Sequence, residues 1–170
     1  HFITLNEPQI VLKLGYADGV HAPGNRYPLP QLVQCWKNLM LAHGLSFRAI
    51  RQAAPDAKVG IASTGKLCYP HSPADEAAAQ QETFRLTDTD WMFTHPIVLD
   101  AVCFGRVAPE DGALSELLQT ITQEEWDTMH AIPDFIGVNS YNGSEIAADA
   151  NGQSLYLPRP KGFACTALKW

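Results

Sequence analysis

His1-Phe2-Ile3-Thr4-Leu5-Asn6-Glu7-Pro8 opens the chain and carries the clearest structural signal in the sequence. The apolar run from Phe2 to Leu5 predicts a buried strand, which ends in the polar pair Asn6-Glu7. Pro8 cannot donate to a strand ladder, so it marks the end of the strand. A carboxylate and an amide therefore stand together at a strand end, where they are candidates for chemistry.

Two further apolar runs end in the same way. Val59 to Ala62 is followed by Ser63-Thr64, and Phe135 to Val138 is followed by Asn139-Ser140-Tyr141. Short runs of this kind are typical of strands that are buried on both faces of a parallel sheet. Helical segments lie between the runs, so the sequence predicts an α/β fold of βα units, which keeps polar sites at the carboxyl ends of its strands.

Three helices are predicted between these strands. Leu32 to Ala54 repeats its apolar residues near a 3.6-residue period. Ser72 as N-cap and Pro73 at the first helical position begin a second helix, and its Ala-rich part from Asp75 extends towards Trp91. A capping box from Thr122 to Glu125 opens a short helix that ends at about Ala131.

The loops and the chain ends give a further expectation. Asp18 to Pro30 is rich in Gly and Pro, and Gly143 to Pro160 reads as a second long irregular segment. The chain begins within a strand at His1, without Met, and stops at Trp170. We expect one partial domain over residues 1–170, taken from something longer.

Composition excludes several classes of partner. The net charge is −6, and the 12 Lys and Arg residues are scattered singly rather than clustered. Nucleic acids and anionic membranes bind clustered cations, so neither is expected as a partner. No apolar run approaches the roughly 18–20 residues of a membrane span.

The four cysteines are far apart in the sequence. No CxxC pair and no His at metal-ligand spacing accompanies them, so no metal site is predicted. We interpret them as free thiols of an intracellular, cytoplasmic protein rather than as a disulfide pair. They are Cys35, Cys68, Cys103 and Cys165.

The residues around Glu7 alone allow two interpretations of its role. Burial at a strand end disfavours a charged carboxylate, and a protonated carboxylic acid can give its proton to a leaving oxygen. Asn6 beside it offers donors and an acceptor that suit a hydroxyl-rich ligand. The alternative is an ordinary strand end with a solvated Glu and an Asn turn.

Thr4-Leu5-Asn6-Glu7-Pro8 resembles the acid/base motif of the family 1 glycoside hydrolases, the β-glucosidase family. Further segments resemble motifs of the same family and occur in the same order along the chain. They are Gly15 to Gly24, Asn38 to His43, Val59 to Ile61, Asp75 to Ala79, Trp91 to Ile97 and Asp134 to Tyr141.

The resemblance implies a fold and an activity. The chain would form the central segment of a (β/α)8 TIM barrel, with strands four to six in three to four βα units. The implied reaction is the retaining hydrolysis of β-glycosides or oligosaccharides, without a cofactor. Glu7 would be the general acid/base, Asn6 would hold the sugar 2-hydroxyl, Asn139 would line the same pocket, and Tyr141 would hydrogen-bond the nucleophile.

The sequence departs from the family at the nucleophile. The family carries it in a Thr-Glu-Asn-Gly motif on the seventh strand, and this chain contains no such motif. His95 also stands where the family has Asp. Asp18, Glu145 and Asp149 are carboxylates in loops that could replace the nucleophile, although loop carboxylates are usually solvated.

Three hypotheses follow. The chain is part of a β-glucosidase whose other strands lie elsewhere, or a minimal form completed by self-association, or a non-catalytic carbohydrate-binding or inactive barrel fragment. Open strand edges invite pairing, so self-association is expected if the chain is complete.

Overall fold

The computed structural model describes residues 1–162 and residue 164, which divide into two compact units. The first unit comprises residues 1–65 and 86–139, and the second comprises residues 66–85 and 140–170. The expectation of a single domain over residues 1–170 stays a prediction. Cys165 lies outside the described residues.

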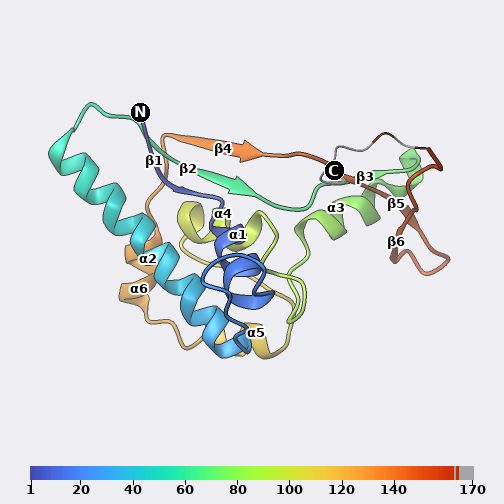
Figure 1. Ribbon diagram of the computed structural model, residues 1–170, viewed down its shortest axis with the longest axis horizontal. Helices are drawn as coiled ribbons and strands as arrows, with labels where there is room; N and C mark the ends of the chain where they lie inside the picture. Colours follow the sequence, from blue (N-terminus) through green and yellow to red (C-terminus); the bar gives the residue numbers. More distant parts are fainter. Residues whose placement is uncertain (163, 165–170) are drawn as a thin grey trace. The chain divides into compact units, whose positions relative to one another are not determined.

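The first unit contains a parallel three-stranded sheet of order β1-β2-β4 (Figure 1). Its strands are β1 (Phe2–Asn6), β2 (Val59–Thr64) and β4 (Phe135–Asn139), at the three predicted places. Only β2 is buried along its whole length. The expectation of burial on both faces is wrong for β1 and β4, whose residues are all half-buried or exposed, because helices cover only one face of the sheet (Figure 1).

Helices cover one side of this sheet (Figure 1). The predicted long helix and the predicted capping box are confirmed, whereas two helices between them were not predicted. Residues 18–28 contain neither helix nor strand, as expected for the first long loop. The helical elements are α1 (Pro8–Ile10), a π-helix (Val11–Ala17), α2 (Leu29–Ala53), α4 (Pro96–Phe104), α5 (Ala113–Leu118) and α6 (Gln123–Met129).

The core of the first unit lies among these helices and β2. It is apolar and contains two buried tryptophans, Trp36 and Trp91, and the indole N–H of Trp36 donates to the carbonyl of Ile97 at 2.8 Å. Trp91, which is 1% exposed, is therefore a packing residue. None of the described helices is long and apolar enough to cross a membrane.

The second unit is a smaller sheet with one helix. Its strands β3 (Cys68–Pro70), β5 (Ser144–Ala148) and β6 (Ser154–Tyr156) have the order β3-β5-β6, with the last pair antiparallel. A 3₁₀ turn (Pro73–Asp75) with the predicted Ser72 cap leads into α3 (Glu76–Phe84).

Two expectations for the second unit are wrong. The helix ends at Phe84 rather than near Trp91, because Arg85 adopts extended backbone and Leu86 is buried in the core of the first unit. The segment from Gly143 to Pro160 contains β5 and β6 rather than irregular chain, because β5 pairs with both neighbouring strands.

His43 on α2 is a buried core residue. Its Nδ1 lies 2.6 Å from the Thr4 hydroxyl and its Nε2 lies 3.1 Å from the Ala131 carbonyl. A neutral ring satisfies both contacts, since Nε2–H donates to the carbonyl and Nδ1 accepts from the hydroxyl. Burial lowers the pKa of His43 below the usual 6.5.

We expect the free energy of unfolding to fall as the pH drops below about 6.5. In that window unfolded His43 takes up a proton that the folded residue does not, so protons favour the unfolded chain. Urea unfolding near neutral and near acidic pH should show a smaller loss for His43→Gln than for the wild type. His21→Gln, which replaces an exposed His, is the matched control. An equal loss in wild type and His43→Gln would contradict the expectation.

Candidate active site

The polar residues that follow the three parallel strands meet at one edge of the first unit. Glu7 follows β1, Ser63 and Thr64 end β2, and Asn139 ends β4. Parallel pairing brings these ends together, and Thr64 stands opposite Asn139 in the register. The sheet edge therefore carries a carboxylate, two hydroxyls and an amide.

Glu7 has an unusual backbone conformation. With φ 48° and ψ 55° it is the one non-glycine residue with positive φ in the described part of the chain. Such a left-handed residue costs about 1–2 kcal/mol, so its surroundings must hold it there. Its N–H donates to the Ala62 carbonyl at 2.8 Å, and its carbonyl accepts from the Ile10 N–H at 2.9 Å. The chain thus turns sharply from β1 into α1 at this half-buried residue.

Asn139 joins two of the other predicted site residues. Its Nδ2 donates to Oε1 of Glu7 at 2.6 Å and to Oδ1 of Asn6 at 3.3 Å. Its own carbonyl accepts from the Thr64 hydroxyl at 3.0 Å. Three of the four site residues predicted from the sequence are therefore in contact, and an amide donor is aimed at the Glu7 carboxylate.

A buried polar network lies behind this cluster. Nε2 of Gln9 donates to the Ser63 hydroxyl at 2.7 Å, and that hydroxyl lies 2.9 Å from Nδ1 of His95. Burial lowers the pKa of His95, which favours the neutral form of the ring that contacts Ser63. Gln9 and Ser63 were not predicted from the sequence as supporting residues. Their only signal was the polar end of an otherwise apolar strand.

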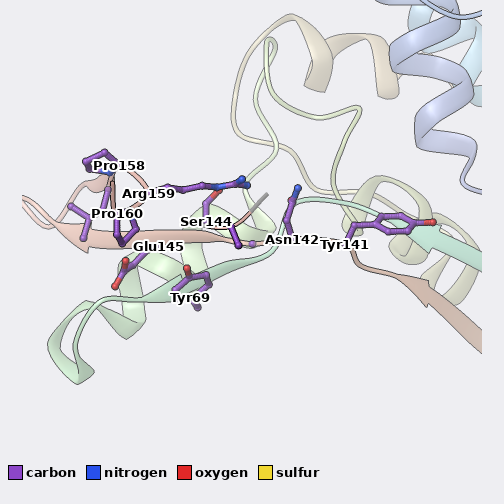
Figure 2. Close-up of a pocket in the computed structure, with 11 residues that line it drawn as sticks. Tyr69, Tyr141, Asn142, Ser144, Glu145, Pro158, Arg159 and Pro160 are labelled. Atoms are coloured by element: carbon purple, nitrogen blue, oxygen red, sulfur yellow. The ribbon is translucent and has the colours of Figure 1, made fainter. Parts of the chain in front are cut away.

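Tyr141 lies in the second unit, where it lines a pocket of about 380 Å³ (Figure 2). Tyr69, Glu145 and Arg159 line the same pocket. Two aromatic rings with charged and amide groups form a surface of mixed polarity that could accept a polyhydroxyl compound. The role of Tyr141 towards a nucleophile stays a prediction.

The three carboxylates considered as nucleophiles have partners of their own, and Glu145 lies on β5 rather than in the expected loop. Asp18 forms an ion pair with Lys13 at 2.9 Å. Glu145 lies 2.9 Å from Nδ1 of His71. Asp149 closes a tight turn by accepting the N–H groups of residues 151 and 153, each at 2.8 Å. Each carboxylate is thus engaged in local structure.

The described residues contain no candidate metal site. They contain no group of three or more His, Cys, Asp or Glu side chains that could hold an ion. Cys35, Cys68 and Cys103 are free. Burial raises the pKa of the Cys68 thiol, which makes it a poor nucleophile. The cluster around Glu7 is therefore the candidate site in the described part of the chain.

Parallel βα units with a polar cluster at the carboxyl ends of the strands are typical of (β/α)-barrel enzymes. The sequence profile of Glycosyl hydrolase family 1 matches residues 1–162, and the chain belongs to that family. The open sheet of the first unit is a partial (β/α)8 barrel.

Characterised relatives agree with this assignment. A 1,4-beta-D-glucan glucohydrolase from Thermotoga neapolitana is 28% identical over 174 residues, covering 100% of this chain and 39% of the relative. Beta-glucosidase 16 of Arabidopsis thaliana is 33% identical over 163 residues, covering 82% of this chain and 29% of the relative. The structure of a beta-glucosidase from Thermotoga maritima in complex with noeuromycin superposes with a TM-score of 0.73 at 27% identity. That superposition covers 99% of this chain and 36% of the enzyme. The chain thus spans between 29% and 39% of the length of these relatives.

Proposed function

We propose that this chain supplies the general acid/base of a retaining β-glycosidase of the β-glucosidase type, with Glu7 in that role. The observation that carries the proposal is the contact between Asn139 and the Glu7 carboxylate at the strand ends, 2.6 Å long. An acid/base must be held in one orientation to meet the leaving oxygen, and this contact orients the carboxylate.

The proposed reaction has two steps. A carboxylate outside this chain attacks the anomeric carbon as the glycosidic bond breaks, and the proton of Glu7 passes to the leaving oxygen. The Glu7 carboxylate then takes a proton from water, which displaces the nucleophile and releases the sugar with retained configuration. Asn6 and Asn139 are proposed to contact the sugar hydroxyls, and Tyr141 to hydrogen-bond the nucleophile.

Self-association is part of the proposal for the isolated chain. Four apolar side chains on the edge strands of the first unit are between 44% and 61% exposed: Phe2, Ile3, Ile136 and Val138. Exposed apolar residues on unpaired strand edges favour contact with another chain, either the remainder of a barrel or a second copy.

An intracellular location is also proposed, on the evidence of the free cysteines. Three described cysteines carry no disulfide, which is typical of proteins kept in a reducing compartment.

A chimera tests the proposed function. Residues 1–162 of this chain would replace the matching segment of the Thermotoga maritima enzyme, whose remaining strands supply a nucleophile. We expect the chimera to hydrolyse phenyl β-glucoside, and the isolated chain to have no activity, because one carboxylate cannot complete a retaining reaction. Circular dichroism would first establish that the chimera is folded.

The alternative, a non-catalytic carbohydrate-binding fragment, predicts a different result. A folded chimera that binds deoxynojirimycin, a ligand of the Thermotoga maritima enzyme, but does not hydrolyse the glucoside would favour that alternative.

A further inference from the structure

Gln9, the second residue after Glu7, has every polar group of its side chain engaged. It is only 1% exposed. Its Nε2 donates to the Ser63 hydroxyl at 2.7 Å and to the Thr94 carbonyl at 3.2 Å. Its Oε1 accepts from the Thr64 N–H at 3.4 Å. A buried amide is stable only when its groups are bonded in this way, so the side chain is fixed in one place.

These contacts attach both flanks of Glu7 to the end of β2. On one side the Glu7 N–H donates to the Ala62 carbonyl at 2.8 Å. On the other side the Gln9 amide bonds the next two residues of the same strand, Ser63 and Thr64. The left-handed conformation of Glu7 persists only if the surrounding structure enforces it, and β2 does so from both directions.

A second route runs from Gln9 to the Glu7 side chain. Thr64, whose N–H bonds Gln9, donates through its hydroxyl to the Asn139 carbonyl at 3.0 Å. Asn139 in turn donates from Nδ2 to Oε1 of Glu7 at 2.6 Å. Backbone and side chain of Glu7 are thus both linked to one buried amide.

We propose that Gln9 is the positioning residue of the acid/base, fixing the turn that aims the Glu7 carboxylate at the leaving oxygen. The inference rests on the proposed function of Glu7 and deepens it. Gln9 itself does not touch substrate, because it is buried and its polar atoms are engaged by Ser63, Thr64 and Thr94.

The kinetic test is Gln9→Leu in the chimera. We expect kcat for phenyl β-glucoside to fall by roughly tenfold to a hundredfold with KM little changed, since a misplaced acid weakens only the transition state. The loss should be much smaller for 2,4-dinitrophenyl β-glucoside, whose leaving group departs without a proton. Gln34→Leu makes the same change on the exposed face of α2 and should leave both rates unchanged. A loss that is equal for the two substrates would overturn the inference.

A second test uses the 170-residue chain and needs no activity. The side-chain amide resonances of Asn139 in a ¹H–¹⁵N spectrum report its bond to Glu7, and we expect them to shift in Gln9→Leu. Ser63→Ala removes only one partner of Gln9, so we expect this variant to fold even if Gln9→Leu does not. The Asn139 resonances should shift in Ser63→Ala too, but less than in Gln9→Leu. Unchanged Asn139 resonances in folded Ser63→Ala would overturn the inference.

Glu7→Gln separates this inference from the proposed function. If Glu7→Gln abolishes hydrolysis by the chimera while Gln9→Leu has no effect, the inference fails and the proposed function stands. If Glu7→Gln leaves the rate unchanged, the proposed function fails, and the inference fails with it.

Discussion

Glu7→Gln in the chimera is expected to lower kcat/KM for phenyl β-glucoside by roughly 10²–10⁴-fold. Gln has nearly the same shape and can accept the bond from Asn139, but it has no proton to give to the leaving oxygen. The same variant should retain most of its kcat/KM for 2,4-dinitrophenyl β-glucoside, because that leaving group needs no proton in the first step. Initial rates on the two substrates measure the effect.

The difference between the substrates separates a lost acid from a damaged fold. Glu116→Gln, which makes the same change at an exposed position of α5, is the matched control and should keep both rates. Equal losses on both substrates in Glu7→Gln would show that Glu7 supports the structure rather than the proton transfer.

Gly44→Ala is expected to cause the largest loss of stability in the first unit. Gly44 lies on α2 where the helix packs against α6, and an added Cβ would stand 1.8 Å from the backbone carbonyl oxygen of Thr128. Ala favours a helix over Gly by about 1 kcal/mol. Overpacking against fixed backbone costs about 1–3 kcal/mol or more, so the overlap dominates.

Urea unfolding of the chain measures this effect. The midpoint should fall for Gly44→Ala, whereas Ser46→Ala on the exposed face of the same helix should leave it unchanged or raise it slightly. A stability equal to that of the wild type would mean that α2 and α6 do not pack as closely as the structure shows.

The strands and the central cluster could be predicted because local pattern determines them. Apolar runs that end in Asn6-Glu7 and in Asn139 are recognisable one at a time, and parallel pairing then brings their ends together. The three strands, the α2 helix and the Thr122 cap follow in this way from periodicity and capping alone.

Long-range contacts explain what could not be predicted. Gln9 and His95 are far apart in the sequence, and only the fold brings both to the Ser63 hydroxyl. Similarly, β5 depends on pairing with β3 and β6. The stretch that contains β5 and β6 is rich in small and polar residues, so its residue types do not predict strands. The left-handed backbone of Glu7 also has no signal in the residue type, since Glu rarely adopts it.

Azide rescue of Glu7→Ala in the chimera tests the central claim most directly. Without an acid/base, the glycosyl-enzyme formed from 2,4-dinitrophenyl β-glucoside waits for a nucleophile that needs no deprotonation, and azide is one. We expect azide to raise the rate and the product to be β-glucosyl azide, of retained configuration. No rate increase with azide, or the α-anomer as product, would contradict Glu7 as the acid/base of a retaining β-glycosidase.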